Sequence, residues 1–223
     1  VQDGRYNNPR AWYIHQLFGG APESTPAAMD QPFICRPTHR LAIEDLKQAF
    51  SSHYQGTDYD PYTNPEKPYR PVALNRNLEL HLLQIRNQVP VAIAGVHWLA
   101  FGPNSFNAVV PFYANVTTTP APYAATSGDY DPLNMYWLTN TLAALGDHRY
   151  QAAAPKVEAF EETVVAKGRQ VQAQMDAKAG AVTDLSAALA TTNEQMATVC
   201  QQEAIKLLGQ LVKDAFTHER LSF

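Results

Sequence analysis

The sequence has few cysteines, no long apolar run and no concentration of positive charge. Its only cysteines are Cys35 and Cys200, which rules out a disulfide framework, and no Cys/His spacing typical of zinc sites occurs. The longest apolar run, residues 89–101, is too short to cross a bilayer and contains His97. The formal charge of −4 is spread over mixed acids and bases and forms no basic stripe for nucleic acid. We therefore expect a cytoplasmic protein with reduced cysteines and with neither membrane nor nucleic-acid partners.

Proline and aromatic residues nearly disappear from the last third of the chain. Fifteen of the 16 prolines, all 11 tyrosines and all three tryptophans lie at or before residue 150, and no proline follows Pro155. Residues 1–150 therefore predict strands and ordered loops, and residues 151–223 predict long helices. The expected fold class is α+β, with two regions that meet near residue 150.

Apolar periodicity predicts most elements of the first region. Residues 41–54 read as a helix with Ile43 and Phe50 on its apolar face, ended by Gly56. Residues 10–18 fit a strand or a helix, and residues 19–40 and 57–76 read as loops. Short turns connect three predicted strands, which favours an antiparallel meander. These strands are residues 78–86, 89–101 and 106–113. A further helix is expected over residues 133–145, ended by Gly146.

The second region predicts a helical hairpin. Apolar side chains recur at helical spacing in two stripes that are separated by a turn at Gly180. The stripes are Val157, Phe160, Val164, Val171 and Met175, then Leu185, Leu189, Thr192, Met196 and Val199. Either Thr183 or Asp184 is placed to cap the second helix. Packing within the fold is the main interpretation, and a partner-binding coiled coil is the alternative.

The loop over residues 56–76 holds the best candidates for a binding site. Loops fixed by glycine and proline beside a sheet often carry sites. Its candidate residues are Tyr59, Tyr62 and Tyr69 as aromatic walls, and Arg70 and Arg76 as forked donors for a carboxylate. The arginines could equally bond backbone carbonyls and fix the loop. A calcium loop at Asp58, Asp60 and Asn64 is rejected because the glycine and the final glutamate of that motif are missing. No metal or other cofactor is expected.

Two other residue types invite a catalytic interpretation. Cys35 lies near Arg36 and His39, but an internal cysteine between an apolar pair and a proline more often packs as a small apolar group. Cys200 falls within a helix and is assigned to packing. His81 sits in a predicted strand on the face opposite Leu80. It is either a half-exposed strand histidine or the base that a Cys–His hydrolase would need, and it is kept as a candidate for the substrate site.

Several strings in the first 150 residues resemble a known family when taken in order. They are Tyr6-Asn7-Asn8-Pro9-Arg10-Ala11-Trp12; His53-Tyr54-Gln55-Gly56-Thr57-Asp58-Tyr59-Asp60-Pro61-Tyr62; Tyr69-Arg70-Pro71; Glu79-Leu80-His81-Leu82-Leu83-Gln84-Ile85-Arg86; Trp98-Leu99-Ala100-Phe101-Gly102; Val110-Pro111-Phe112-Tyr113; and Tyr136-Trp137. Together they resemble the C-terminal half of the dipeptidases best known from lactic acid bacteria, which are related to secernins and to penicillin V acylase.

The resemblance implies an N-terminal-nucleophile (Ntn) hydrolase. Its fold would be an αββα sandwich, of which residues 1–150 supply the C-terminal part, with residues 151–223 as a hairpin packed on it. Its activity would be hydrolysis of dipeptides by an N-terminal cysteine whose own α-amine serves as the base.

This chain departs from that scheme because it begins at Val1, without an initiator Met, and neither of its cysteines is terminal. The nucleophile is therefore expected in an upstream half, and this chain alone is expected to be inactive. Its expected partners are a dipeptide, that upstream half and a second copy in a homo-oligomer. The alternatives are a noncatalytic secernin-like interaction protein, or an Ntn amidase acting on another amide.

Overall fold

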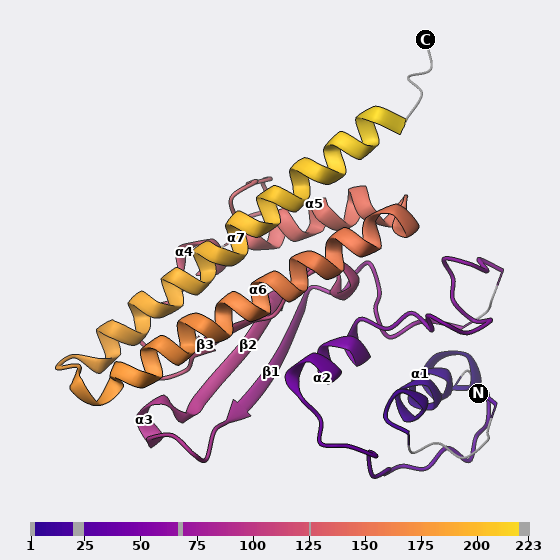
Figure 1. The fold of residues 1–223 in the computed structure, drawn as a ribbon. Helices are drawn as coiled ribbons and strands as arrows, with labels where there is room; N and C mark the ends of the chain where they lie inside the picture. The colour runs from indigo at the N-terminus through magenta and orange to yellow at the C-terminus, as the bar shows by residue number, and fades with distance from the viewer. Residues whose placement is uncertain (1–2, 20–24, 67–68, 125, 219–223) are drawn as a thin grey trace. The chain divides into compact units, whose positions relative to one another are not determined.

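The computed structural model describes residues 3–19, 25–66, 69–124 and 126–218 (Figure 1). By its internal contacts the chain forms two compact units, Val1–Leu74 and Asn75–Phe223, and each is described by itself. The boundary near residue 150 that the composition indicates stays a prediction.

The first unit contains two helices, α1 (Asp3–Leu17) and α2 (Ile43–Phe50), joined by irregular backbone over the described residues between them. The segment 10–18 that fitted either a strand or a helix is thus largely α1. The α2 helix starts where the Asp45 carboxylate accepts a hydrogen bond from the Ala42 amide at 2.7 Å. It ends earlier than predicted. Tyr54 and Gly56 have φ angles of 68° and 78°, and this left-handed backbone cannot continue a helix.

The buried face of α2 differs from the one that periodicity predicted. Ile43 and Ala49 are buried, but Phe50 is 40% exposed, and Lys47 is only 1% exposed. The ammonium group of Lys47 donates a hydrogen bond to the Ser51 hydroxyl at 2.6 Å. The aliphatic stem of a lysine packs like an apolar residue when its charged end finds a polar partner, so Lys47 takes a place that the sequence assigned to apolar residues.

The second unit is built on a three-stranded antiparallel sheet, which confirms the predicted meander. Its strands are β1 (Glu79–Ile85), β2 (Gly95–Phe101) and β3 (Val110–Tyr113), in the order β1-β2-β3. In the register, Leu83 faces His97 and His81 faces Leu99. The predicted strand 89–101 is partly wrong, because its first residues form the short helix α3 (Val91–Ala94). The guanidinium of Arg86 holds this turn in place by donating to the Ile93 carbonyl at 2.5 Å.

Long helices cover one face of this sheet. The elements after β3 are α4 (Ala121–Ala124), α5 (Met135–Asp147), α6 (Tyr150–Lys178), a 3-10 turn (Ala179–Ala181) and α7 (Leu185–His218). The α6 and α7 helices lie against each other and contact β3 (Figure 1), so the predicted hairpin is confirmed. Asp184 caps α7 by accepting from the Ala187 amide at 3.1 Å. The α5 helix ends at Asp147, one residue past the predicted end at Gly146, and a Cβ atom at Gly146 would lie 2.6 Å from the Phe106 ring.

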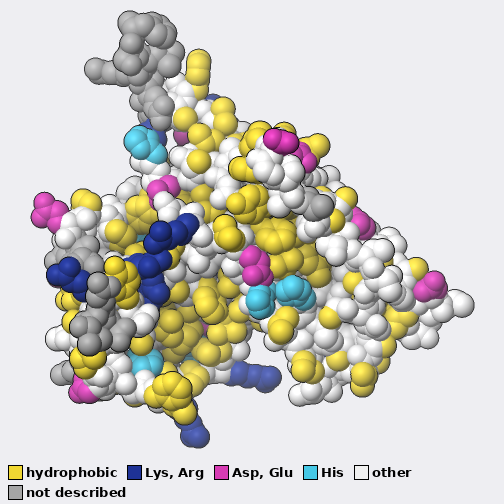
Figure 2. Space-filling model, turned by 180° about the vertical axis from the view of Figure 1, so that it is seen from behind, with side chains coloured by type: hydrophobic (Ala, Val, Ile, Leu, Met, Phe, Trp, Pro, Cys, Tyr) yellow, Lys and Arg dark blue, Asp and Glu magenta, His cyan; other side chains and the backbone are white. Residues whose placement is uncertain are grey.

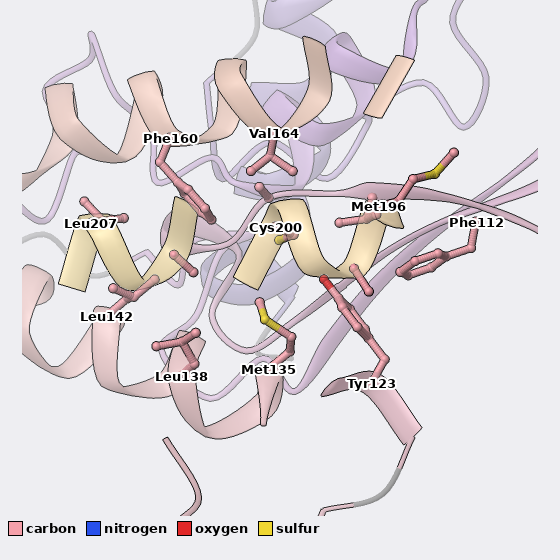
Figure 3. Packing of buried hydrophobic residues seen from close by; sticks show 14 of the residues in the cluster. Phe112, Tyr123, Met135, Leu138, Leu142, Phe160, Val164, Met196, Cys200 and Leu207 are labelled. Carbon is pink, nitrogen blue, oxygen red and sulfur yellow. The ribbon is translucent and has the colours of Figure 1, made fainter. Parts of the chain in front are cut away.

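The core of the second unit lies between α5, α6, α7, α4 and β3 (Figure 3). The labelled side chains of Figure 3 come from all five elements. They are Phe112, Tyr123, Met135, Leu138, Leu142, Phe160, Val164, Met196, Cys200 and Leu207. Both predicted stripes of the hairpin supply members of this core, which favours packing within the fold over a separate coiled coil.

A buried polar network joins the hairpin to the sheet. Asp176 of α6 forms a bidentate ion pair with Arg86, at 2.5 and 3.1 Å, and accepts from the Tyr113 hydroxyl at 2.6 Å. Asn193 of α7 exchanges two hydrogen bonds with the backbone of Tyr113. Burial, and then the hydrogen bond to Asp176, raise the pKa of Tyr113. Among the described residues, none of the helices is both long enough and apolar enough to span a membrane.

Candidate substrate-binding site

A buried histidine–aspartate pair organises the loop that follows α2. The Nδ1 atom of His53 lies 2.9 Å from the Asp60 carboxylate, and both side chains are at most 8% exposed. The same carboxylate oxygen accepts from the Tyr62 amide at 2.9 Å. The His53 ring meets the Tyr62 ring edge-on, with centroids 4.9 Å apart. These contacts fix the backbone of residues 53–64 without any regular element.

The three candidate tyrosines separate into two places. Tyr59 and Tyr69 lie together, with ring centroids 5.1 Å apart, and Trp12 of α1 meets Tyr59 edge-on at 5.8 Å. Tyr62 instead packs on His53. An aromatic wall is therefore available from Tyr59, Tyr69 and Trp12, while Tyr62 supports the loop.

Arg70 is held through its backbone, and its guanidinium is left for other uses. Its amide donates to the Arg5 carbonyl at 3.2 Å, and its carbonyl accepts from the Tyr54 hydroxyl at 2.7 Å. The guanidinium carbon lies 5.7 Å from the centre of the Tyr6 ring, within cation–π range. The Nε atom is buried without a hydrogen-bond partner, and no described carboxylate forms an ion pair with this side chain.

A second arginine lies beside the first. Nε of Arg10, from α1, donates to the carbonyls of Arg70 and Pro71 at 3.3 and 3.1 Å. Burial, and after it the like charge of Arg70, lower the pKa of Arg10, while Tyr54 acts in the opposite direction. Two guanidinium charges near each other repel unless an anion lies between them. We call Arg10, Arg70, Tyr59 and Tyr69 the arginine–tyrosine group.

The two remaining candidates, Arg76 and His81, belong to the second unit. Arg76 is exposed in the segment before β1. His81 is exposed on β1, and its Nδ1 atom lies 2.5 Å from the Glu79 carboxylate. Its ring also meets that of His97 on β2, with centroids 5.6 Å apart. Both readings that the sequence left open for His81 therefore stay open.

The cysteines differ in environment, although both are free. Cys200 is 1% exposed in the core of the second unit, as the packing prediction required. Burial raises the pKa of its thiol to about 12, and the Tyr123 hydroxyl only partly offsets this rise. Cys35 is half-buried in irregular backbone.

The sequence analysis did not predict the contacts of Arg10 or the pairing of His53 with Asp60. Arg10 stood in a quoted string but was not weighed, because nothing local pairs it with a residue 60 positions away. The His53–Asp60 pair was missed because neither residue lies in a periodic pattern. A seven-residue spacing between histidine and aspartate across a turn-rich loop was the one available signal.

Comparisons with known proteins agree on one family. Residues 1–163 match Peptidase family C69. The chain is 44% identical to Dipeptidase A of Lactobacillus helveticus, over 96% of this chain and 46% of that protein. It is 41% identical to Probable dipeptidase B of Lactococcus lactis subsp. lactis, over 100% of this chain and 48% of that protein.

A dipeptidase of Bifidobacterium longum is 36% identical, over 78% of this chain and 35% of its own length. The chain thus spans about half the length of the first two of these relatives. The family match covers well over half of this chain, and the similarity to the first two relatives covers nearly all of it. The resemblance read from the ordered strings is therefore confirmed, and the chain belongs to Peptidase family C69.

Proposed function

We propose that this chain is part of a dipeptidase and that its arginine–tyrosine group binds the C-terminal carboxylate of the substrate. The observation that carries the proposal is the pair Arg10 and Arg70, whose neighbouring positive charges have no ion pair with a described carboxylate. A dipeptide carries a free carboxylate, and a guanidinium binds it with two parallel hydrogen bonds. Tyr59 and Tyr69 would border the substrate side chain. Arg76 and His81, which belong to the second unit, stay separate candidates for substrate contact.

The catalytic nucleophile of this proposal lies outside the chain. It is an N-terminal cysteine of the whole protein, whose thiol proton passes to its own α-amine as the sulfur attacks the peptide carbonyl. Collapse of the tetrahedral intermediate expels the amine of the second amino acid, and water then releases the first. Support comes from the length of the relatives, of which this chain covers 46% and 48%. By itself the chain would then hydrolyse no dipeptide.

The rest of the whole protein would complete the fold. In the proposed αββα sandwich, the sheet of the second unit packs face to face with a sheet of the upstream half. Leu83 and Ile85 of β1 are 77% and 78% exposed, which leaves apolar area for such a neighbour. Two free cysteines suit a cytoplasmic location, and a homo-oligomer remains part of the proposal.

The carboxylate contact is tested with Arg70→Ala in the whole protein, assayed on a dipeptide and on its C-terminal amide. Loss of a charge-assisted hydrogen bond costs about 1.5–3 kcal/mol, so KM for the dipeptide should rise roughly 10- to 100-fold while kcat changes less. Amidation of the dipeptide should raise KM by a similar factor in the native protein. It should raise KM little further in the Arg70→Ala variant, because both changes remove the same contact.

Arg40→Ala is the matched control, since Arg40 is an exposed arginine of the same unit. If Arg70→Ala and amidation raised KM by independent factors that multiply, Arg70 would not bind the substrate carboxylate, and the proposal would be wrong. A lower melting temperature with unchanged KM would instead assign Arg70 to loop stability. The backbone contacts of Arg70 do not involve its side chain, so the substitution removes only the stacking on Tyr6 among its described contacts.

The two alternatives differ in what they need from this group. A noncatalytic interaction protein would need no substrate, and kcat would be zero for every dipeptide. An amidase acting on another amide would be indifferent to the C-terminal carboxylate, and so to amidation.

A further inference from the structure

A second group of polar side chains lies on the sheet of the second unit, on the face that carries Leu83. Glu79 and His81 are two positions apart on β1, so both point to the same side of the sheet. His97 on β2 faces Leu83 and is therefore diagonal to His81. Diagonal neighbours on adjacent strands are within reach of long and aromatic side chains.

The side chains converge. One ligand atom from each of Glu79, His81 and His97 lies within 4.8 Å of the other two. The His81 and His97 rings are 5.6 Å apart with planes at 78°, so they are not stacked on each other. Figure 2 shows acidic and histidine side chains lying together, with apolar side chains around them. Among the described residues, no other group of three histidine, cysteine or acidic side chains meets this distance criterion.

An independent observation concerns His97, the third member of this group. The Nε2 atom of His97 is buried and has no hydrogen-bond partner among the described residues. A buried polar atom left unpaired costs about 1–3 kcal/mol, so such atoms usually have a partner that the protein chain does not supply.

We propose that Glu79, His81 and His97 bind a divalent transition-metal ion, with Zn²⁺ as its representative. Two imidazole nitrogens and one carboxylate oxygen form a mixed set that suits Zn²⁺ and not Ca²⁺ or Mg²⁺, which prefer oxygen ligands throughout. Ligand atoms on a tetrahedral zinc ion lie about 3.4 Å from one another, so small side-chain rotations bring the three atoms into place. The ion takes the place of the proton that Glu79 and His81 share.

The site has an open side. The His81 and Glu79 side chains are 53% and 38% exposed, whereas the Nε2 atom of His97 is buried. Three protein ligands with one free position allow a water molecule or another small ligand to complete the tetrahedron. This assignment revises the expectation of no metal site. Sequence spacing could not show it, because His97 lies 16 positions after His81 and only the strand register brings the two residues together.

Titration calorimetry of the purified protein with ZnCl₂ tests the site, with Co²⁺ absorption as a second readout. The wild type should bind one ion per chain and give the visible bands of tetrahedral Co²⁺. His81→Asn and Glu79→Gln should each raise the Kd at least about 10- to 100-fold, the range seen when even supporting residues of metal sites are removed. Both residues are exposed enough for these variants to fold, which an unchanged melting temperature would verify.

The matched control is His39→Asn. His39 pairs with the Asp45 carboxylate at 3.6 Å with exposures of 50% and 30%, close to those of the His81–Glu79 pair, but it belongs to no group of three ligands. Its loss should leave the Kd unchanged. Absence of saturable Zn²⁺ binding by the wild type, or equal Kd values for wild type and His81→Asn, would overturn the site. Metal binding is read directly, so failure of the proposed peptidase activity would not affect the result.

Discussion

The environment of each cysteine determines how its thiol reacts. The thiolate is the nucleophilic form, and burial raises the pKa of Cys200 to about 12, so almost none is ionised near neutral pH. No reagent reaches it without local opening of the core between α4, α5 and α7 (Figure 3). Cys35 is half-buried and outside any regular element.

We therefore expect iodoacetamide to modify one thiol per native chain and two per denatured chain. Mass spectrometry of the digested protein should place the native label on Cys35, and Cys35→Ala should abolish it. The same variant bears on the proposed mechanism: a dipeptidase activity of this chain that disappears in Cys35→Ala would place the nucleophile here. Labelling of Cys200 in the native state would show that the hairpin opens readily.

At the level of residues, only part of the candidate site could be predicted from the sequence. Arg70 and the tyrosines were named as candidates because they share one proline-rich loop. The contacts of Arg10 and the pairing of His53 with Asp60 were not predicted, because no periodic pattern records them. Lys47 is a related case, since its burial on α2 depends on the hydroxyl that receives its charge.

Two glycines of the hairpin differ in what surrounds them. A Cβ atom added to Gly168 of α6 would lie 2.8 Å from the Pro111 ring of β3, closer than real contacts allow. Gly209 of α7 is exposed, and nothing lies within 4 Å of such an atom. Gly168 therefore permits the close approach of helix and sheet, whereas Gly209 only lowers helix propensity.

These surroundings predict opposite effects of one substitution. Gly209→Ala should stabilise the fold by about 0.5–1 kcal/mol, because it removes backbone freedom from the unfolded chain. Gly168→Ala also removes backbone freedom from the unfolded chain, but it forces the proline ring or the helix to move. That movement costs about 1–3 kcal/mol, so the net effect should be destabilising. Urea unfolding of both variants measures the difference. A stabilised Gly168→Ala would mean that α6 is not seated on β3 as described.

At the level of elements, long periodic segments were the most predictable. The hairpin was read correctly because apolar side chains repeat over many turns in α6 and α7. The run 89–101 was partly misread, since a short apolar segment fits a strand and a helical turn equally well. At α3 the helical turn is stabilised by Arg86, which directly follows β1 and donates a hydrogen bond to the Ile93 carbonyl. This contact is not visible in the apolar pattern of residues 89–101.

The sheet of the second unit is incomplete when seen as part of a whole molecule. The β1 strand is at one edge, so one side of its backbone lacks a strand partner within the described sheet. Leu83 and Ile85 are far more exposed than apolar side chains of a sheet face normally are. Leu83 pairs with His97 in the register, so a neighbour that covers Leu83 and Ile85 also borders the proposed metal site.

The proposed upstream half is the neighbour that should cover Leu83 and Ile85, and without it the face should associate with itself. In light scattering, the 24.7 kDa chain should show a mass above that of a monomer, and Leu83→Thr with Ile85→Thr should lower it. Threonine keeps the strand preference while removing apolar area, so the variant should remain folded. Phe216→Ser is the control, because Phe216 is 82% exposed on α7, away from the sheet face. A monodisperse monomer of the unmodified chain would show that the second unit completes its own core, and the proposed sandwich would lose its main physical support.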